Sequence, residues 1–404
     1  MGNIKTDEIA ALSNSLRPRL DAVLICLSNA WGGLEQVASE DARDLVRLGL
    51  RVKFMCSDGS PVHSYLSDLK PGDRPVLLPV SYKPRNYFDM KMRADINDWI
   101  KSGINLIHTH QTSLLGSISP WLWWKKNVAF FATRHMLSRH DKRDFLHHAV
   151  FARLDAMLVM SEALRRNVLN THPIGPERVK IVNLGLSLEK FDTTNADPSP
   201  QRKHFGVEQD ELAIGMVGRI DPAKGQATFI KAAAGLLKDG IGKPPLKFII
   251  VGEETRGSSK AKNHVAELKC MVEQLKIGEY VLLAGFMDNI PEVMQAFDIV
   301  VMPSRQETFG LVAIEAMAME RPIVISSGGS ASEIVGDNER GLVMRPEDAF
   351  DLQLQLRRLI AQPELRAEMG RRAREYVISN YNRNKRVLET LRLYDSSLSR
   401  RKFN

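Results

Sequence analysis

Glu307 and Glu315 are the carboxylates whose setting best suits ligand chemistry. They lie in the segment Met302 to Pro322, where a helical spacing of apolar residues begins near Phe309 and Gly310. The start of a helix presents N–H groups without partners and partial positive charge, so it can bind phosphate. An elongated ligand that contacts both glutamates with phosphates between them has the shape of a nucleotide sugar. The alternative is a solvated loop acid and a surface helix acid.

Arg219 and Lys224 form a second candidate pair, in the stretch G-R-I-D-P-A-K-G between Gly218 and Gly225. Two cations at this spacing can neutralise a diphosphate leaving group from one side while a helix end holds it from the other. The alternative is a loop held by salt bridges. Because the spacing G-x-x-x-x-G-K-[ST] is not met, hydrolysis of ATP or GTP is disfavoured.

Gly32 and Gly33 follow the first strand-like run and precede a helical pattern. Residues without a Cβ atom let the backbone approach a ligand, although a plain turn is the alternative. The spacing G-x-G-x-x-G is absent, and Ser57-Asp58 after the second strand lies in a glycine–serine turn. A nicotinamide-dependent enzyme is therefore disfavoured.

His135 follows a strand-like run, and we expect it to donate a hydrogen bond to a sugar or phosphate; the alternative is a structural role. The spacing H-E-x-x-H and a cysteine cluster are both absent, so no metal site is expected. The absence of a D-x-D triplet argues against a divalent metal that carries the diphosphate. The G-x-S-x-G motif of many hydrolases is also absent, so a hydrolase of that kind is disfavoured.

Alternating strand-like runs and helical patterns must position these residues. This alternation predicts the α/β class, with doubly wound parallel sheets that are covered on both faces and bind ligands at the carboxyl ends of their strands. A polar leader precedes the first strand. The expected strands cover residues 21–28, 51–56, 76–80, 104–108, 128–133, 155–160, 179–183, 212–217, 246–251, 281–283, 298–302 and 322–326.

The length of 404 residues favours two domains. A polar, proline-bearing stretch over 186–212 is the expected linker. We predict a Rossmann-like domain over 1–190, a second over 191–378, and a helix over 379–404 that crosses back toward the first domain. The two domains are expected to face each other across a cleft.

Composition is that of an ordinary soluble protein, with 44% hydrophobic and 26% charged residues. Three widely spaced cysteines indicate reduced thiols, and there is neither a signal peptide nor an apolar run of about 18 residues, so we expect a cytoplasmic protein. Met1 to Thr6 fits a loose myristoylation pattern, which we set aside because it is short.

The net charge of +8 is concentrated in residues 121–180 and 371–404. The first block opens with Trp121-Leu122-Trp123-Trp124-Lys125-Lys126, and tryptophans beside lysines suit the anionic face of a membrane. The alternative is a helix with its aromatic side chains in the core. Nucleic acid is a less suitable partner, because no basic sheet with interleaved aromatics and no zinc-finger spacing occurs.

Together these motifs resemble glycosyltransferase family 4, whose members have the GT-B architecture of two Rossmann-like domains. The resemblance runs from about Asp21 to Tyr381. It is carried by G-G-L-E (32–35), T-R-H (133–135), V-N-L-G (182–185), V-G-R-I-D-P-A-K-G (217–225), V-G-E (251–253), P-S-R-Q-E-T-F-G-L-V-A-I-E-A-M (303–317) and S-S-G-G (326–329). The family often has Asn-Gly near residue 183, whereas Leu184 separates Asn183 from Gly185 here, so we assign these residues no role.

The resemblance implies a retaining, metal-independent transfer from a nucleoside-diphosphate sugar, with no cofactor. Glu307 would contact the donor sugar, and Glu315 would hold the ribose hydroxyls. Arg219 and Lys224 would stabilise the leaving diphosphate. The backbone N–H groups that would bind its phosphates belong to Phe309, Gly310 and Leu311.

Three residues of the first domain complete the implied site. Gly32 and Gly33 would let this domain close on the donor, and His135 would lie beside the sugar. In the usual proposal for the family no single side chain is the base, since an oxygen of the leaving phosphate takes the acceptor proton on the same face.

The favoured hypothesis is transfer from a UDP- or GDP-sugar to a lipid-linked or polysaccharide acceptor in cell-surface glycan or lipopolysaccharide biosynthesis. The acceptor would bind the first domain near its basic, tryptophan-bearing region, with peripheral contact to the inner face of the cell membrane as one option. The alternatives are a soluble GT-B epimerase or a sucrose- or glycogen-type synthase, and a catalytically silent scaffold. Intact Arg219, Lys224, Glu307 and Glu315 speak against the scaffold.

Overall fold

A computed structural model describes residues 2–85, 87–240, 244–254, 259–329, 332–336 and 338–401. The chain forms two compact units. The first contains the described residues up to Gly185 and those from Arg383 onward, and the second is Leu186–Asn382. The boundaries drawn from the sequence, 190 and 378, lie a few residues from these divisions.

The first unit is built on a seven-stranded parallel sheet in the order β3-β2-β1-β4-β5-β6-β7. Its strands are β1 (Asp21–Cys26), β2 (Arg51–Ser57), β3 (Val76–Val80), β4 (Leu106–Thr109), β5 (Ala129–Thr133), β6 (Ala156–Val159) and β7 (Val179–Ile181). Its α-helices are α1 (Gly2–Leu16), α2 (Gly33–Arg47), α3 (Pro61–Ser67), α4 (Met90–Lys101), α5 (Leu115–Leu122), α6 (Phe145–Ala152), α7 (Glu162–Thr171) and α16 (Arg383–Ser399).

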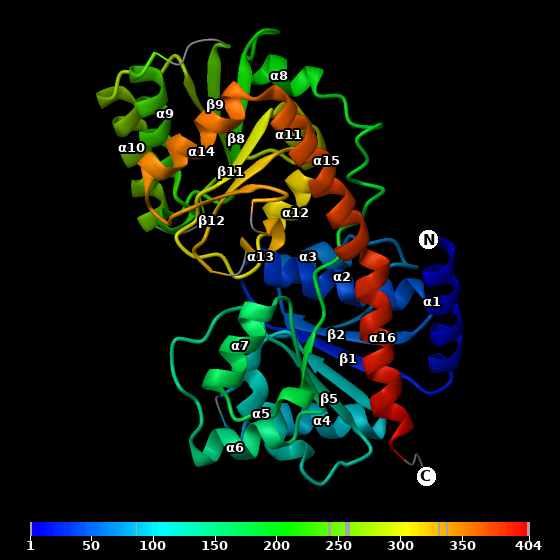
Figure 1. Cartoon of the computed structure of the whole chain (residues 1–404). Helices are drawn as coiled ribbons and strands as arrows, with labels where there is room; N and C mark the ends of the chain where they lie inside the picture. The colour runs from blue at the N-terminus through cyan, green and yellow to red at the C-terminus, as the bar shows by residue number, and fades with distance from the viewer. Residues whose placement is uncertain are drawn as a thin grey trace. The chain divides into compact units, whose positions relative to one another are not determined.

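Helix α1 corrects the expectation of a polar leader. Its buried Ile9 and Leu16 join the core of the first unit, together with Leu391 and Leu398 of α16. The two helices lie side by side in Figure 1, where α1 is dark blue and α16 is red. A local sequence pattern does not predict this packing, because the partner helix lies at the opposite end of the sequence.

The second unit is built on a six-stranded parallel sheet in the order β10-β9-β8-β11-β12-β13. Its strands are β8 (Leu212–Val217), β9 (Leu246–Val251), β10 (Val281–Gly285), β11 (Ile299–Met302), β12 (Ile323–Ser326) and β13 (Leu342–Met344). Its α-helices are α8 (Ser199–Phe205), α9 (Gln226–Lys238), α10 (Ser259–Gln274), α11 (Ile290–Ala296), α12 (Leu311–Ala318), α13 (Ser332–Val335), α14 (Ala349–Ala361) and α15 (Pro363–Asn380).

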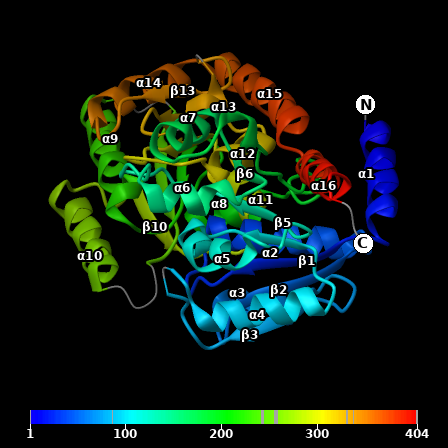
Figure 2. The same cartoon turned by 90° about the horizontal axis from the view of Figure 1, so that it is seen from below.

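Helices cover both faces of this second sheet, as the alternation predicted. On one face α9 packs between α10 and α14, and on the other α12 packs against α11 and α15 (Figure 1). Figure 2 shows α9 and α14 side by side from a second direction. The sequence analysis did not predict α8, which interrupts the expected linker, or the short strand β13.

The predicted α/β class is confirmed, since each unit is a Rossmann-like parallel sheet with helices on its faces. None of the helices in the described ranges combines the length and apolar character needed to cross a lipid bilayer.

Candidate functional site

Candidate donor-binding residues and two glycines lie at the carboxyl ends of adjacent strands in the second unit. Arg219 follows β8, Glu307 follows β11, and Gly328 and Gly329 follow β12. These three strands are neighbours in the order β8-β11-β12. From β8 the chain continues to β9 on one side, and from β11 to β12 on the other, so the site is at the topological switch point where ligands of such sheets bind.

Lys224 and Glu307 form an ion pair in which Lys224 Nζ lies 2.6 Å from Glu307 Oε2. Both side chains are about one quarter exposed, 28% and 20%. Ser304, which is buried, lies with its Oγ 3.5 Å from the same carboxylate oxygen. An ammonium group has three donors, so Lys224 can keep this contact and still donate to a phosphate oxygen. The structure thus brings the predicted acid and the predicted cation together.

Glycines let the loops around this ion pair pack backbone against backbone. Gly225 has φ +81°, and a Cβ atom there would overlap the carbonyl oxygen of Pro303. Gly329 has φ +102°, and a Cβ atom there would overlap the carbonyl oxygen of Glu307. The Glu307 N–H also donates to the Gly328 carbonyl at 2.8 Å. These contacts fix the backbone that carries both Lys224 and Glu307.

The start of α12 is the end of the helix that the sequence analysis predicted to bind phosphate. Gly310 precedes the helix with φ +96°, a left-handed conformation that suits glycine, and no side chain caps the helix. Phe309 is buried, and its ring meets the Tyr381 ring edge-on at 5.7 Å between centroids. This packing of Phe309 holds the backbone at the start of α12, where the N–H groups near Leu311 have no partner within the helix.

Glu315 lies in α12 and is half-buried. Desolvation by the surrounding protein raises the pKa of its carboxyl group to about 7, and the nearby positive charge of Lys190 offsets only part of this shift. A carboxyl group with such a pKa exchanges its proton near neutral pH. Lys190 lies within the stretch expected to be the linker, and no sequence motif associates it with Glu315.

Arg219 lies in a loop shaped by a second glycine contact. A Cβ atom on Gly252 would overlap the carbonyl oxygen of Gly218, so the β8 and β9 loops pack closely. Gln226, buried at the start of α9, donates from Nε2 to the Arg219 carbonyl at 2.8 Å. The Arg219 side chain is exposed, at the same strand end as Lys224.

Gly32, Gly33 and His135 belong to the first unit, at the carboxyl ends of β1 and β5. Gly32 precedes α2 without a side-chain cap, and a Cβ atom there would lie 3.4 Å from a carboxylate oxygen of Glu35, which is buried. Contact of these residues with a ligand that the second unit also binds remains a prediction.

His108, His110 and His135 form a row of three histidines that the motif analysis did not identify. The His108 and His110 rings stack at 4.6 Å between centroids, and the His110 and His135 rings follow at 5.6 Å. Burial lowers the pKa of His108 to about 4 and that of His135 to about 3, and it lowers the pKa of His110 well below its usual range. All three imidazoles are therefore neutral at physiological pH.

The row is supported by α2 and α16. Asp41 of α2 forms a buried ion pair with Arg386 of α16, through contacts of 2.5 and 2.7 Å. Asp41 stands on the same face of α2 as the buried Val37, Ala38, Ala42 and Leu45. A charged residue at an apolar position was the sequence signal for a buried ion pair.

Gly185, to which we gave no role, is a packing residue. A Cβ atom there would come within 2.6 Å of the Arg383 Cα atom, so the chain can pass α16 here only with glycine. Asn183 contributes its carbonyl oxygen, which accepts from Arg386 Nη1 at 3.2 Å.

Among the described residues, no group of three or more histidine, cysteine, aspartate or glutamate side chains is arranged to hold a metal ion.

Comparison with known proteins identifies both halves of the chain. Residues 31–190 match the model of Glycosyltransferase Family 4, and residues 199–376 match the model of Glycosyl transferases group 1. A D-inositol 3-phosphate glycosyltransferase of Saccharomonospora viridis is 25% identical over 376 residues, which cover 85% of each chain.

Solved structures with the same fold cover nearly the whole chain. A glycosyltransferase from Rickettsia africae has a TM-score of 0.85 at 19% identity, over 95% of this chain and 100% of that chain. Anabaena HepE in complex with UDP-glucose has a TM-score of 0.78 at 19% identity, over 94% of this chain and 100% of that chain. These likenesses support the GT-B fold. With a family model on each half of the chain, the protein belongs to glycosyltransferase family 4.

Proposed function

We propose that the protein transfers a sugar from a UDP- or GDP-sugar to a lipid-linked or polysaccharide acceptor, with retention of configuration and without a metal ion. The observation that carries this proposal is the Lys224–Glu307 ion pair beside the uncapped start of α12. A cation, an acid and unpaired N–H groups are the parts that a diphosphate and its sugar require. Anabaena HepE, which has the same fold, binds UDP-glucose.

In this proposal Arg219, Lys224 and the α12 N–H groups stabilise the diphosphate as the glycosidic C–O bond breaks. The acceptor hydroxyl attacks from the face that the diphosphate leaves, and a phosphate oxygen takes its proton. Glu307 contacts the sugar, and Glu315 accepts hydrogen bonds from the ribose hydroxyls. Gly32, Gly33 and His135 approach the donor from the first unit.

The test is a transfer assay with UDP-, GDP- and ADP-sugars in the presence of EDTA, followed by NMR of the anomeric proton of the product. We expect a product with the donor's anomeric configuration, and the isosteric Glu307→Gln variant should lower kcat. An inverted product, or full inhibition by EDTA that added metal reverses, would refute the retaining or the metal-independent part of the proposal.

A role at a membrane is supported by the region around α5. Trp124 is 87% exposed and Phe145 is 88% exposed, and Lys125 and Lys126 adjoin Trp124. Helix α5 packs against α4 and α6, which places these residues in one part of the first unit (Figure 1). Exposed aromatics beside cations favour an anionic bilayer surface. We propose peripheral contact at this region, in the cytoplasm.

Flotation with vesicles tests this contact. The parent should float with vesicles that contain phosphatidylglycerol and remain behind with neutral phosphatidylcholine vesicles, and Trp124→Ala should float less. The control is Phe350→Ala, because Phe350 is an exposed aromatic of the second unit. Equal flotation of parent and Trp124→Ala would refute the assignment.

A soluble acceptor is the second candidate, and a specific observation favours it: the relative in S. viridis is a D-inositol 3-phosphate glycosyltransferase. With a phosphorylated polyol as acceptor, the protein would be a soluble metabolic enzyme that needs no contact with a membrane. Transfer to such a polyol by protein that does not float with vesicles would favour this candidate.

A further inference from the structure

The hydrogen-bonding state of His135 is determined by a buried row of side chains within the first unit. His135 Nε2 lies 3.4 Å from His110 Nδ1, within hydrogen-bond geometry. His110 Nε2 in turn faces Asp41 Oδ2 at 3.9 Å and has no hydrogen-bond partner among the described residues. Because both imidazoles are neutral, each carries one N–H proton, and the direction of the hydrogen bond between them depends on its position.

Two arrangements of the protons are possible, and electrostatics separates them. In the first, His110 carries its proton on Nε2, toward the Asp41 carboxylate, and its Nδ1 accepts from His135 Nε2–H. In the second, the His110 Nε2 lone pair faces the carboxylate at 3.9 Å, which is repulsive. The first arrangement is favoured because it points the partial positive charge of His110 Nε2–H toward the negative Asp41 carboxylate.

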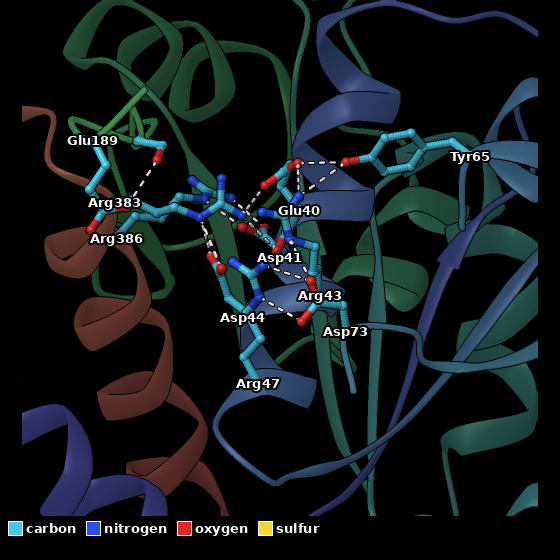
Figure 3. Close-up of polar contacts among 11 residues, drawn as sticks. Glu40, Asp41, Arg43, Asp44, Arg47, Tyr65, Asp73, Glu189, Arg383 and Arg386 are labelled. Atoms are coloured by element: carbon cyan, nitrogen blue, oxygen red, sulfur yellow. Dashed lines mark hydrogen bonds and ion pairs between the residues drawn. The ribbon is translucent and has the colours of Figure 1, made fainter. Parts of the chain in front are cut away.

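The surroundings of Asp41 keep its carboxylate in place. Arg386 holds both carboxylate oxygens, and it also donates to the carbonyl oxygens of Val182 and Asn183 at 3.2 Å each. Figure 3 shows Arg386 and Arg383 reaching from α16 to the acids of α2. Arg383 pairs with Asp44, through contacts of 2.7 and 2.9 Å.

The other groups that face the row leave this direction unchanged. His108, stacked on His110, is held by Tyr394 at 2.6 Å and by Thr133 at 2.8 Å, so neither of its nitrogens contacts His110 or His135 through a hydrogen bond. The positive charge of Arg386 disfavours positive charge on His110, but the guanidinium is paired with Asp41, whose Oδ2 is the atom that faces His110 Nε2. Arg134 precedes His135 and donates instead to Met136 and Thr112, at 2.6 Å each.

We propose that Asp41 and His110 are positioning residues that hold His135 in its Nε2–H tautomer, so that His135 Nδ1 accepts a hydrogen bond from a hydroxyl group of the sugar. His135 Nδ1 has no partner among the described residues, and it is the nitrogen that this arrangement leaves unprotonated. His135 is then an acceptor, the opposite of the donor role predicted from the sequence. The contact between His135 and a sugar rests on the proposed function, whereas the tautomer of His135 does not depend on it.

The tautomer is measured directly by long-range ¹H–¹⁵N correlation spectra of the full chain labelled at histidine, with His135→Gln to assign the ring. Protonated and bare ring nitrogens have well-separated ¹⁵N shifts, so this measurement requires no substrate. The expected result is a protonated Nε2 and a bare Nδ1 on His135. A proton on Nδ1 would overturn the proposal, even if transfer activity were found.

Two variants at position 110 test the effect on the reaction. His110→Phe keeps a ring but removes the acceptor, and we expect kcat to fall about 10- to 100-fold, the range found when the partner that orients a metal-bound histidine is removed. His110→Asn places an amide oxygen, which is also a hydrogen-bond acceptor, near the position of Nδ1. This variant should retain a kcat close to that of the parent. Parent-like kcat in His110→Phe, or equal losses in both variants, would overturn the positioning role.

Tyr394→Phe is the matched control, since it removes a hydrogen bond from the same buried region without contacting His135. We expect a lower melting temperature with unchanged kcat and an unchanged His135 tautomer. If the parent transfers no sugar at all, the proposed function fails while the tautomer measurement still gives its answer, so the two failures can be told apart.

Discussion

At the scale of single residues, Glu315 makes the stability of the second unit depend on pH. Its pKa of about 7 in the folded protein lies above the ordinary glutamate value of 4.5, because desolvation favours the neutral carboxyl group. Between these two values the folded state binds more protons than the unfolded state. Its contribution to stability is therefore complete below about pH 4.5 and is lost as pH rises through about 7.

Glu315→Gln removes this titration while keeping the shape of the side chain. Relative to the variant, the parent should lose on the order of 1–3 kcal/mol of unfolding free energy between pH 5 and pH 8. Urea unfolding of both proteins across this range measures the difference. A difference that stays constant with pH would show that the carboxyl group is not desolvated.

At the scale of elements, close backbone contacts at glycine hold together the loops after β8 and β11. Gly225 combines a positive φ with a close approach to the Pro303 carbonyl, whereas Gly206, which ends α8, has φ +64° and no atom near its Cβ position. Gly206→Ala should therefore cost only the left-handed conformation, about 1–2 kcal/mol. Gly225→Ala adds a clash and should cost more, roughly 3 kcal/mol or above.

Urea titration measures the unfolding of the second unit and compares the two alanine variants. In addition, Gly225→Ala should weaken nucleotide binding, because the clash displaces the loop that carries Lys224. Equal destabilisation by the two substitutions would mean that the close approach to Pro303 contributes nothing.

Helix α16 gives a second prediction at this scale. Arg386→Met leaves the Asp41 carboxylate buried without a partner and should cost roughly 3–5 kcal/mol. The control on the same helix is Arg392→Met, which breaks an exposed ion pair with Glu8 and should change stability little. Thermal or urea unfolding measures both, and similar losses for the two variants would contradict the burial of the Arg386 contact.

How far the sequence predicted these elements depends on their partners. The strands from β1 to β12 and the start of α12 follow from local patterns, namely apolar runs and a glycine before a helical spacing. Helix α1 and the Asp41–Arg386 pair do not, because their stabilising contacts join the two ends of the chain. Strand β13 has only three residues, too few for a periodic pattern.

The candidate site divides in the same way. The two motifs predicted that Lys224 and the segment after Glu307 would act on the same ligand, and adjacent parallel strands bring their carboxyl ends together; the ion pair between Lys224 and Glu307 was not predicted. The role of Lys190 near Glu315 and the row from Asp41 to His135 depend on tertiary packing, which spacing along the chain does not encode.

At the scale of the whole molecule, family 4 membership accounts for two Rossmann-like units with one set of candidate ligand-binding residues in each. The second unit carries charges and helix N–H groups suited to a diphosphate, and the first carries glycines and a neutral histidine suited to a sugar. The proposed function assigns nucleotide binding to the second unit, where a single substitution can test it.

The most direct test of the central claim is calorimetric titration of UDP, GDP and ADP into the parent, Lys224→Ala and Lys238→Ala. Lys238 is the exposed last residue of α9, the helix that begins just after Lys224, and serves as the matched control. One of the nucleotides should bind the parent and Lys238→Ala equally. Loss of a charge-assisted hydrogen bond of about 1.5–3 kcal/mol should weaken its binding to Lys224→Ala by roughly 10- to 100-fold. Equal affinity of Lys224→Ala and the parent would contradict the account.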